Sequence, residues 1–85
     1  MHRLISVKEK LVDVISNGNY EQHDYEQLEY LIQLVDWVLI GRIHLGVETI
    51  KIIMEEIIIT SVHQLNLELL DTLKELNEIK EELHV

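Results

Sequence analysis

The residues best suited to metal binding or acid–base chemistry are five histidines, at positions 2, 23, 44, 63 and 84. A helical zinc site needs ligands one turn apart, as in His-Glu-x-x-His, or cysteines to complete the set. Neither arrangement occurs, and the chain contains no cysteine. His44 and Glu48 can share a helix face, but an accidental pair of this kind is expected in a chain so rich in carboxylates. We therefore predict no metal site.

The adjacent carboxylates Glu55–Glu56 and Glu81–Glu82 are the next candidates for acid–base chemistry. Neighbouring residues on a helix point about 100° apart, so the two carboxylates of a pair do not meet at one substrate atom. The chain's three serines, at positions 6, 16 and 61, lack the tight turn of a nucleophile, and no glycine-rich phosphate loop is present. We predict that the protein is not an enzyme and requires no cofactor.

The charge balance narrows the class of partner. Sixteen acidic and seven basic side chains give a net charge of −9, which repels phosphate backbones and anionic membranes. The only clustered bases are Arg3, Lys8 and Lys10, whereas residues 64–85 carry six carboxylates against two lysines. We expect a partner protein with a basic surface. The carboxylates predicted to contact it are Glu78, Glu81 and Glu82.

The elements that must carry these residues are helices, because apolar residues recur at intervals of three and four. Without proline, the strongest breaks are the three glycines, and Asp24 with Gln27 resembles a capping box. We predict one domain, 1–85, with helices over about residues 3–17, 24–40, 47–60 and 62–83. The third segment has strand-forming isoleucines but no period of two. It is either separate from the fourth or continuous with it.

Two apolar surfaces exceed what so short a chain is expected to cover. Tyr30, Leu34 and Trp37 form a narrow stripe beside the broad core stripe of the second helix, and this stripe faces either a partner or the core. The other surface is a coiled-coil-like seam near the C-terminus, which predicts a homodimer. Its predicted interface residues are Val62, Leu65, Leu69, Leu76, Ile79 and Leu83.

The segment Leu45–Lys51 offers an alternative function. A glycine turn followed by a helix is typical of the recognition helix in helix-turn-helix proteins. Here the helix begins Val-Glu-Thr and provides one lysine, so few groups are available for phosphates or base edges. A DNA-binding transcriptional regulator is therefore retained only as an alternative.

Residues 7–40 supply a second alternative through Gln33 and Asp36, which lie in Leu31-Ile-Gln-Leu-Val-Asp36, and through the Asn17-Gly18 loop. This stretch resembles the Spo0E-like sporulation phosphatases, small helical hairpins with a Ser-Gln-Glu-Leu-Asp motif. Ile32 and Leu34 stand at the motif's serine and glutamate. The resemblance implies a phosphatase acting on a phosphorylated response regulator.

Taken together, the sequence predicts an all-α protein of three or four antiparallel helices with a long C-terminal helix, forming a dimeric bundle. Its expected function is that of a small acidic regulator, an inhibitor, adaptor or antitoxin-like protein that occupies a surface of its partner. The start lacks a signal-peptide pattern and no apolar run reaches the roughly 20 residues of a membrane span, so we expect a cytoplasmic location. Abundant Ile, Lys, Glu and Asn without Ala or Pro suggests a phage or mobile-element origin.

Overall fold

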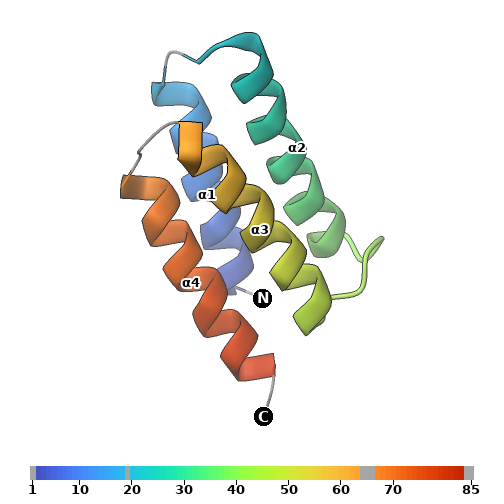
Figure 1. Cartoon of the computed structure of the whole chain (residues 1–85). Coiled ribbons are helices and arrows are strands. Elements are labelled where there is room, and N and C mark those ends of the chain that lie inside the picture. The colour runs from blue at the N-terminus through green and yellow to red at the C-terminus, as the bar shows by residue number, and fades with distance from the viewer. Residues whose placement is uncertain (1, 19, 64–66, 84–85) are drawn as a thin grey trace.

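Four helices make up the chain in the computed structural model, which describes residues 2–18, 20–63 and 67–83. They are α1 (His2–Asn17), α2 (Gln22–Leu39), α3 (Val47–His63) and α4 (Leu67–Leu83). No strand occurs within these ranges. Each helix packs against two others: α1 and α3 each contact both α2 and α4 (Figure 1). The prediction of an all-helical protein is confirmed.

The first helix places its core residues on one stripe. Leu4, Val7, Leu11 and Val14 recur every three or four residues and are completely or almost completely buried. The helix ends just before Gly18, over which the ring of Tyr20 folds while its hydroxyl donates to the Val14 carbonyl at 3.0 Å. An added Cβ at position 18 would lie 2.0 Å from that ring. The tyrosine therefore depends on the glycine for its position.

The N-terminal end of α2 differs from the prediction, whereas its C-terminal end lies at a glycine as predicted. The capping box was wrong: the helix begins at Gln22 after Glu21, which makes no side-chain cap bond, and Gln27 instead donates to Glu56 on α3. At the other end Gly41 has φ +82°, the left-handed conformation that favours glycine. The amide of Gly41 donates to Val38, and that of Arg42 donates to Trp37. This pair of bonds is the Schellman motif, which satisfies the last carbonyls of a helix.

The isoleucine-rich segment is helical, because its buried residues follow the helical period. Ile50, Ile53 and Ile57 are fully buried along α3. Of the two alternatives for the C-terminal half, the structure has two helices, α3 and α4, that pack against each other (Figure 1). The hydroxyls of the buried Thr60 and Thr72 donate to the carbonyls of Glu56 and Glu68 in their own helices. Neither threonine therefore leaves a buried hydroxyl unsatisfied.

All four helices contribute to one hydrophobic core. The radius of gyration is 12.1 Å, close to the value of about 12 Å expected for a compact chain of this length. The buried residues of the four helices meet at the centre of this core. They are Leu4, Val7, Leu11, Val14, Leu28, Leu31, Val35, Val38, Ile50, Ile53, Ile57, Leu69, Leu76 and Ile79.

Candidate functional site

The predicted dimer seam lies largely inside the chain. Leu69, Leu76 and Ile79 belong to the core, where α1 and α3 pack on α4. Among the seam residues whose side chains the structure describes, only Leu83, 37% exposed, remains partly on the surface. Leu65 and the side chain of Val62 lie outside the described residues. The periodicity correctly marked a buried face, but the assignment of its core residues to a second copy is corrected, because the chain folds back to cover them itself.

The stripe of Tyr30, Leu34 and Trp37 divides between core and surface. Leu34 packs against the core, Trp37 is half-buried, and Tyr30 is 44% exposed. Gly41 lies one turn beyond the end of this stripe. An added Cβ there meets nothing within 4 Å, so its positive φ is what requires glycine. Of the three side chains, Tyr30 is the most exposed.

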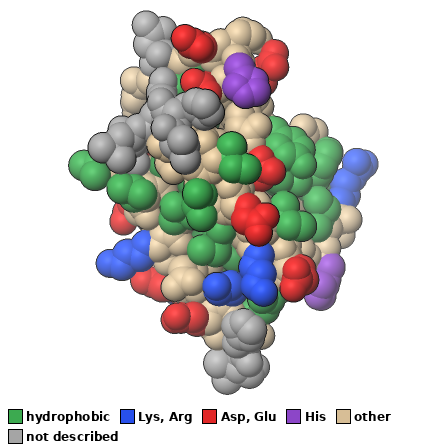
Figure 2. Space-filling model, viewed as in Figure 1, with side chains coloured by type: hydrophobic (Ala, Val, Ile, Leu, Met, Phe, Trp, Pro, Cys, Tyr) green, Lys and Arg blue, Asp and Glu red, His purple; other side chains and the backbone are tan. Residues whose placement is uncertain are grey.

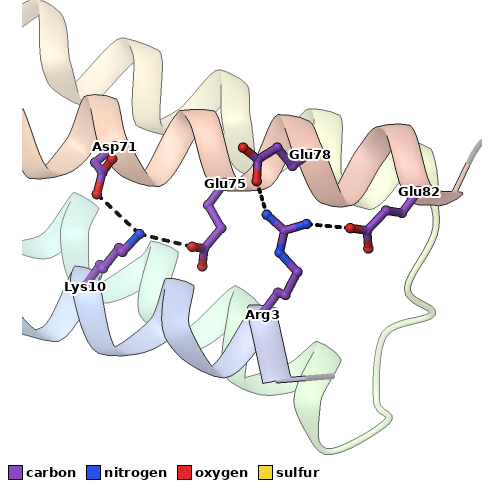
Figure 3. Close-up of polar contacts among 6 residues, drawn as sticks. All are labelled: Arg3, Lys10, Asp71, Glu75, Glu78 and Glu82. Carbon is purple, nitrogen blue, oxygen red and sulfur yellow. Dashed lines mark hydrogen bonds and ion pairs between the residues drawn. The ribbon is translucent and has the colours of Figure 1, made fainter.

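Two of the three carboxylates predicted to contact a partner are bound within the chain. Arg3 on α1 donates to both Glu78 and Glu82 on α4 (Figure 3). The hydrogen bond to Glu78 is the main reason that the pKa of Arg3 is raised. Glu81 is exposed and has no ion pair among the described residues. This acidic face thus serves first to hold α4 against α1.

Lys10 makes a second link between the same helices. Its Nζ lies 3.0 Å from Glu75 Oε2 and 3.3 Å from Asp71 Oδ2 (Figure 3). The bond to Glu75 raises the pKa of Lys10, against the lowering effect of burial, and the bond to Asp71 raises it further. Since Lys8 also pairs with Asp36 on α2, all three bases of the predicted N-terminal cluster are neutralised within the fold.

A surface groove of about 620 Å³ lies between α1 and α2. Ile15 and Ile32 pack against the core and line the groove, while Tyr25 and Tyr30, 40% and 44% exposed, also line it. The remaining lining residues are polar: Lys8, Glu26, Glu29, Gln33 and Asp36. The Nζ of Lys8 lies 2.7 Å from Asp36 Oδ1 and joins the two helices beside the groove.

A second, smaller hollow of about 320 Å³ extends this surface along α1. It shares Lys8 with the groove and adds the exposed Ile5 and Val12 with the carboxylates Glu9 and Asp13. Together the two hollows are lined by five carboxylates and one lysine. Because that lysine is already paired with Asp36, the surface attracts cations. We term the two hollows together the α1–α2 face.

Sequence reasoning missed most of this face. It identified Tyr30 but not Tyr25, Ile5 or Val12, because one dominant stripe per helix had been assigned to the core. The signal is a second apolar row on α1, at positions 5, 8, 12 and 15, interrupted by Lys8. Spacings of three and four put these positions on one flank, but which neighbour lies beside that flank depends on the tertiary fold.

A different surface, formed by α3 and α4, is more apolar. Its exposed large side chains are Ile52, Ile58, Ile59, Leu67 and Leu70. Figure 2, which looks onto these two helices, shows hydrophobic side chains gathered over this side of the molecule. The outcome explains why the isoleucine segment is apolar nearly all round: one side enters the core and the other remains uncovered. We term it the α3–α4 face.

The structure offers little support for a metal site, a membrane-spanning helix or DNA binding by the start of α3. Within the described ranges no group of three His, Asp or Glu side chains could hold a metal ion, and no helix there is long and apolar enough to cross a membrane. At the start of α3, Ile50 and Ile53 lie in the core. Glu48 is exposed, and its Oε1 lies 3.8 Å from Lys51 Nζ. A carboxylate at that position opposes approach to a phosphate backbone.

Comparisons with protein-family models, with curated proteins and with solved structures found no match to this chain.

Proposed function

We propose that the protein is a small acidic regulator, an inhibitor, adaptor or antitoxin-like protein, that binds a basic surface of a partner protein through its α1–α2 face. One observation carries the proposal: exposed tyrosines and aliphatic side chains lie in a hollow whose charged rim is almost entirely acidic. Apolar contact area supplies affinity at such an interface, and charge complementarity speeds association and selects the partner.

The distribution of ion pairs supports this choice of surface. Glu78 and Glu82 already face Arg3, so a partner that used them would have to compete with an existing contact. On the α1–α2 face, four carboxylates have no cation paired with them among the described residues. They are Glu9, Asp13, Glu26 and Glu29. Glu26 accepts a hydrogen bond from Gln22 within α2, and the four carboxylates can meet basic side chains without breaking an ion pair of the fold.

The experiment measures binding of the whole chain to a panel of immobilised basic proteins. A second panel of immobilised acidic proteins serves as the negative control. Association should slow severalfold between about 50 mM and about 300 mM salt. The double substitution Glu26→Lys with Glu29→Lys should weaken it, whereas Glu48→Lys with Glu55→Lys on α3 should change it little. Absence of any binding to basic proteins at low salt would refute the proposal.

Self-association through the α3–α4 face is a further part of the proposal. With Leu69, Leu76 and Ile79 of the seam buried in the chain, the exposed side chains on the α3–α4 face are the apolar surface that a second copy would cover. The order of the ion pairs, Arg3 with Glu78 and Lys10 with Glu75, supports the antiparallel arrangement proposed for α1 and α4.

A cytoplasmic location and a phage or mobile-element origin remain predictions from the sequence.

A second candidate function is the phosphatase, and one observation favours it. Gln33 and Asp36, the two positions that match the motif of the sporulation phosphatases, both line the α1–α2 groove. Against it, Asp36 is engaged by Lys8. Loss of phosphate from phosphorylated response regulators on addition of the protein would support this function, provided that Asp36→Asn abolishes the effect.

A further inference from the structure

We infer that the α1–α2 groove receives a basic, amphipathic α-helix of the partner, seated lengthwise between α1 and α2. The inference rests on the proposed function and specifies the shape and chemistry of the partner segment. Its basis is the arrangement of three features: the length of the groove, its apolar lining, and the carboxylates that α2 places in the groove and α1 places in the adjoining hollow.

The length of the groove suits a short helix. Its lining residues on α2 run from Tyr25 to Asp36, eleven steps along the helix, which is about 16 Å at 1.5 Å per residue. A helix of about three turns covers that distance. The lining offers apolar contact at several points: Ile15 from α1, and Ile32 with the two exposed tyrosines from α2.

The placement of the charges favours a helix over an extended segment. Glu26, Glu29 and Asp36 of α2 line the groove, and Glu9 and Asp13 of α1 line the adjoining hollow, so both helices of the α1–α2 face carry carboxylates beside its apolar side chains. A helix with an apolar stripe can carry cations on both flanks of that stripe, where they meet both rows. In an extended strand, alternate residues point to opposite faces, so cations placed between apolar anchors point away from the groove.

The tyrosines add selectivity for cations. Tyr25 and Tyr30 line the groove with Glu26 and Glu29, and each tyrosine is one helical turn from a carboxylate: Tyr25 from Glu29, and Tyr30 from Glu26. An arginine that reaches such a carboxylate can also stack on a ring face, an interaction that strengthens as water is excluded. We therefore expect arginine to be preferred over lysine on the flank that faces α2.

The test uses three synthetic peptides of about 14 residues and the full-length protein. The helical peptide carries Leu at spacings of three and four with Arg on both flanks; the alternating peptide has the same composition with Leu at every second position; in the third, Glu replaces Arg. Binding is followed by calorimetry, and peptide helicity by circular dichroism. We expect the helical peptide to bind at least about tenfold more tightly than the alternating one and to gain helicity, and the acidic one not to bind.

Two variants locate the contact. Tyr25→Ser with Tyr30→Ser should weaken binding of the helical peptide by about tenfold or more, whereas Ile59→Ser, which removes a similarly exposed side chain on α3, should leave it unchanged. Thermal unfolding of each variant confirms that the fold persists. The helix-in-groove inference is overturned if the helical and alternating peptides bind equally tightly, or if both variants lose the same amount of affinity for the helical peptide. Neither result affects the proposed function, in which the acidic α1–α2 face binds basic proteins. If neither Arg-containing peptide nor any basic protein binds, the proposed function falls as well.

Discussion

Gly41 has one structural task, which is to end α2. Its φ of +82° lies where a side chain is strained, and a Cβ there would meet no neighbour within 4 Å. Gly41→Ala should therefore lower the free energy of unfolding by about 1–2 kcal/mol through backbone strain alone. Asn tolerates this conformation better, so Gly41→Asn should cost less. Denaturant unfolding of both variants measures the difference, and an alanine variant as stable as the wild type would contradict this account.

Lys10 makes the stability of the fold depend on pH in the alkaline range. Its pKa is raised by Glu75 and Asp71 in the folded state, so the ion pairs contribute fully below the unfolded value of about 10.5. The contribution is lost as the pH rises through the folded pKa. The wild type should be more stable than Lys10→Gln by about 0.5–1 kcal/mol near neutral pH, and this difference should shrink toward zero once the pH exceeds the folded pKa of Lys10. Lys10→Arg should stay more stable than Lys10→Gln at every pH, because arginine keeps its charge. A stability difference between wild type and Lys10→Gln that grows with pH would contradict this assignment.

The C-terminal seam shows what helical periodicity specifies and what it leaves open. Spacings of three and four identified Leu69, Leu76 and Ile79 as members of one buried face. The spacings did not identify what packs against this face. A second copy of the chain and α3 of the same chain would each present an apolar surface to it. The break between α3 and α4 decides this, and it has no proline or glycine to mark it.

The candidate site was harder to predict than the core. The stripe of Leu4, Val7, Leu11 and Val14 is visible in the sequence because it is continuous. The groove is assembled from the flanks of two helices, and each flank mixes apolar and charged residues. Net charge indicated the kind of partner, but the ion pairs of Glu78 and Glu82 with Arg3 depend on α4 lying beside α1. Long-range pairing of this kind leaves no periodic signal.

The assignment of α4 to the core predicts a contrast between two of its leucines. Leu76 is fully buried and Leu70 is 44% exposed. Leu76→Ala should lower the free energy of unfolding by about 2–5 kcal/mol through lost burial and a cavity, whereas Leu70→Ala should change it by less than about 0.5 kcal/mol. Urea unfolding at several protein concentrations separates the effect on folding from any effect on association. Equal costs for the two variants would show that α4 does not pack as described.

The whole molecule combines a well-filled core with an uncovered apolar side, the α3–α4 face. Its isoleucines and leucines are between 44% and 78% exposed in the single chain. A second copy would remove this surface from water, with a gain of about 25 cal/mol for each Å² of apolar area covered. The α1–α2 face would stay accessible in such a dimer, because the two faces are formed by different pairs of helices.

Sedimentation at micromolar concentration should accordingly give about twice the 10.0 kDa mass of the chain. Ile58→Lys with Leu70→Lys should return the mass to that of one chain while helicity persists, because both side chains are exposed in the single chain and a buried charge opposes association. Ile5→Lys, at a similarly exposed position on α1, is the matched control and should leave the dimer intact. A wild-type chain that stays monomeric at every concentration would refute the dimer. A dimer that survives the lysine pair but not Ile5→Lys would move the interface to the α1–α2 face, where it would compete with the partner.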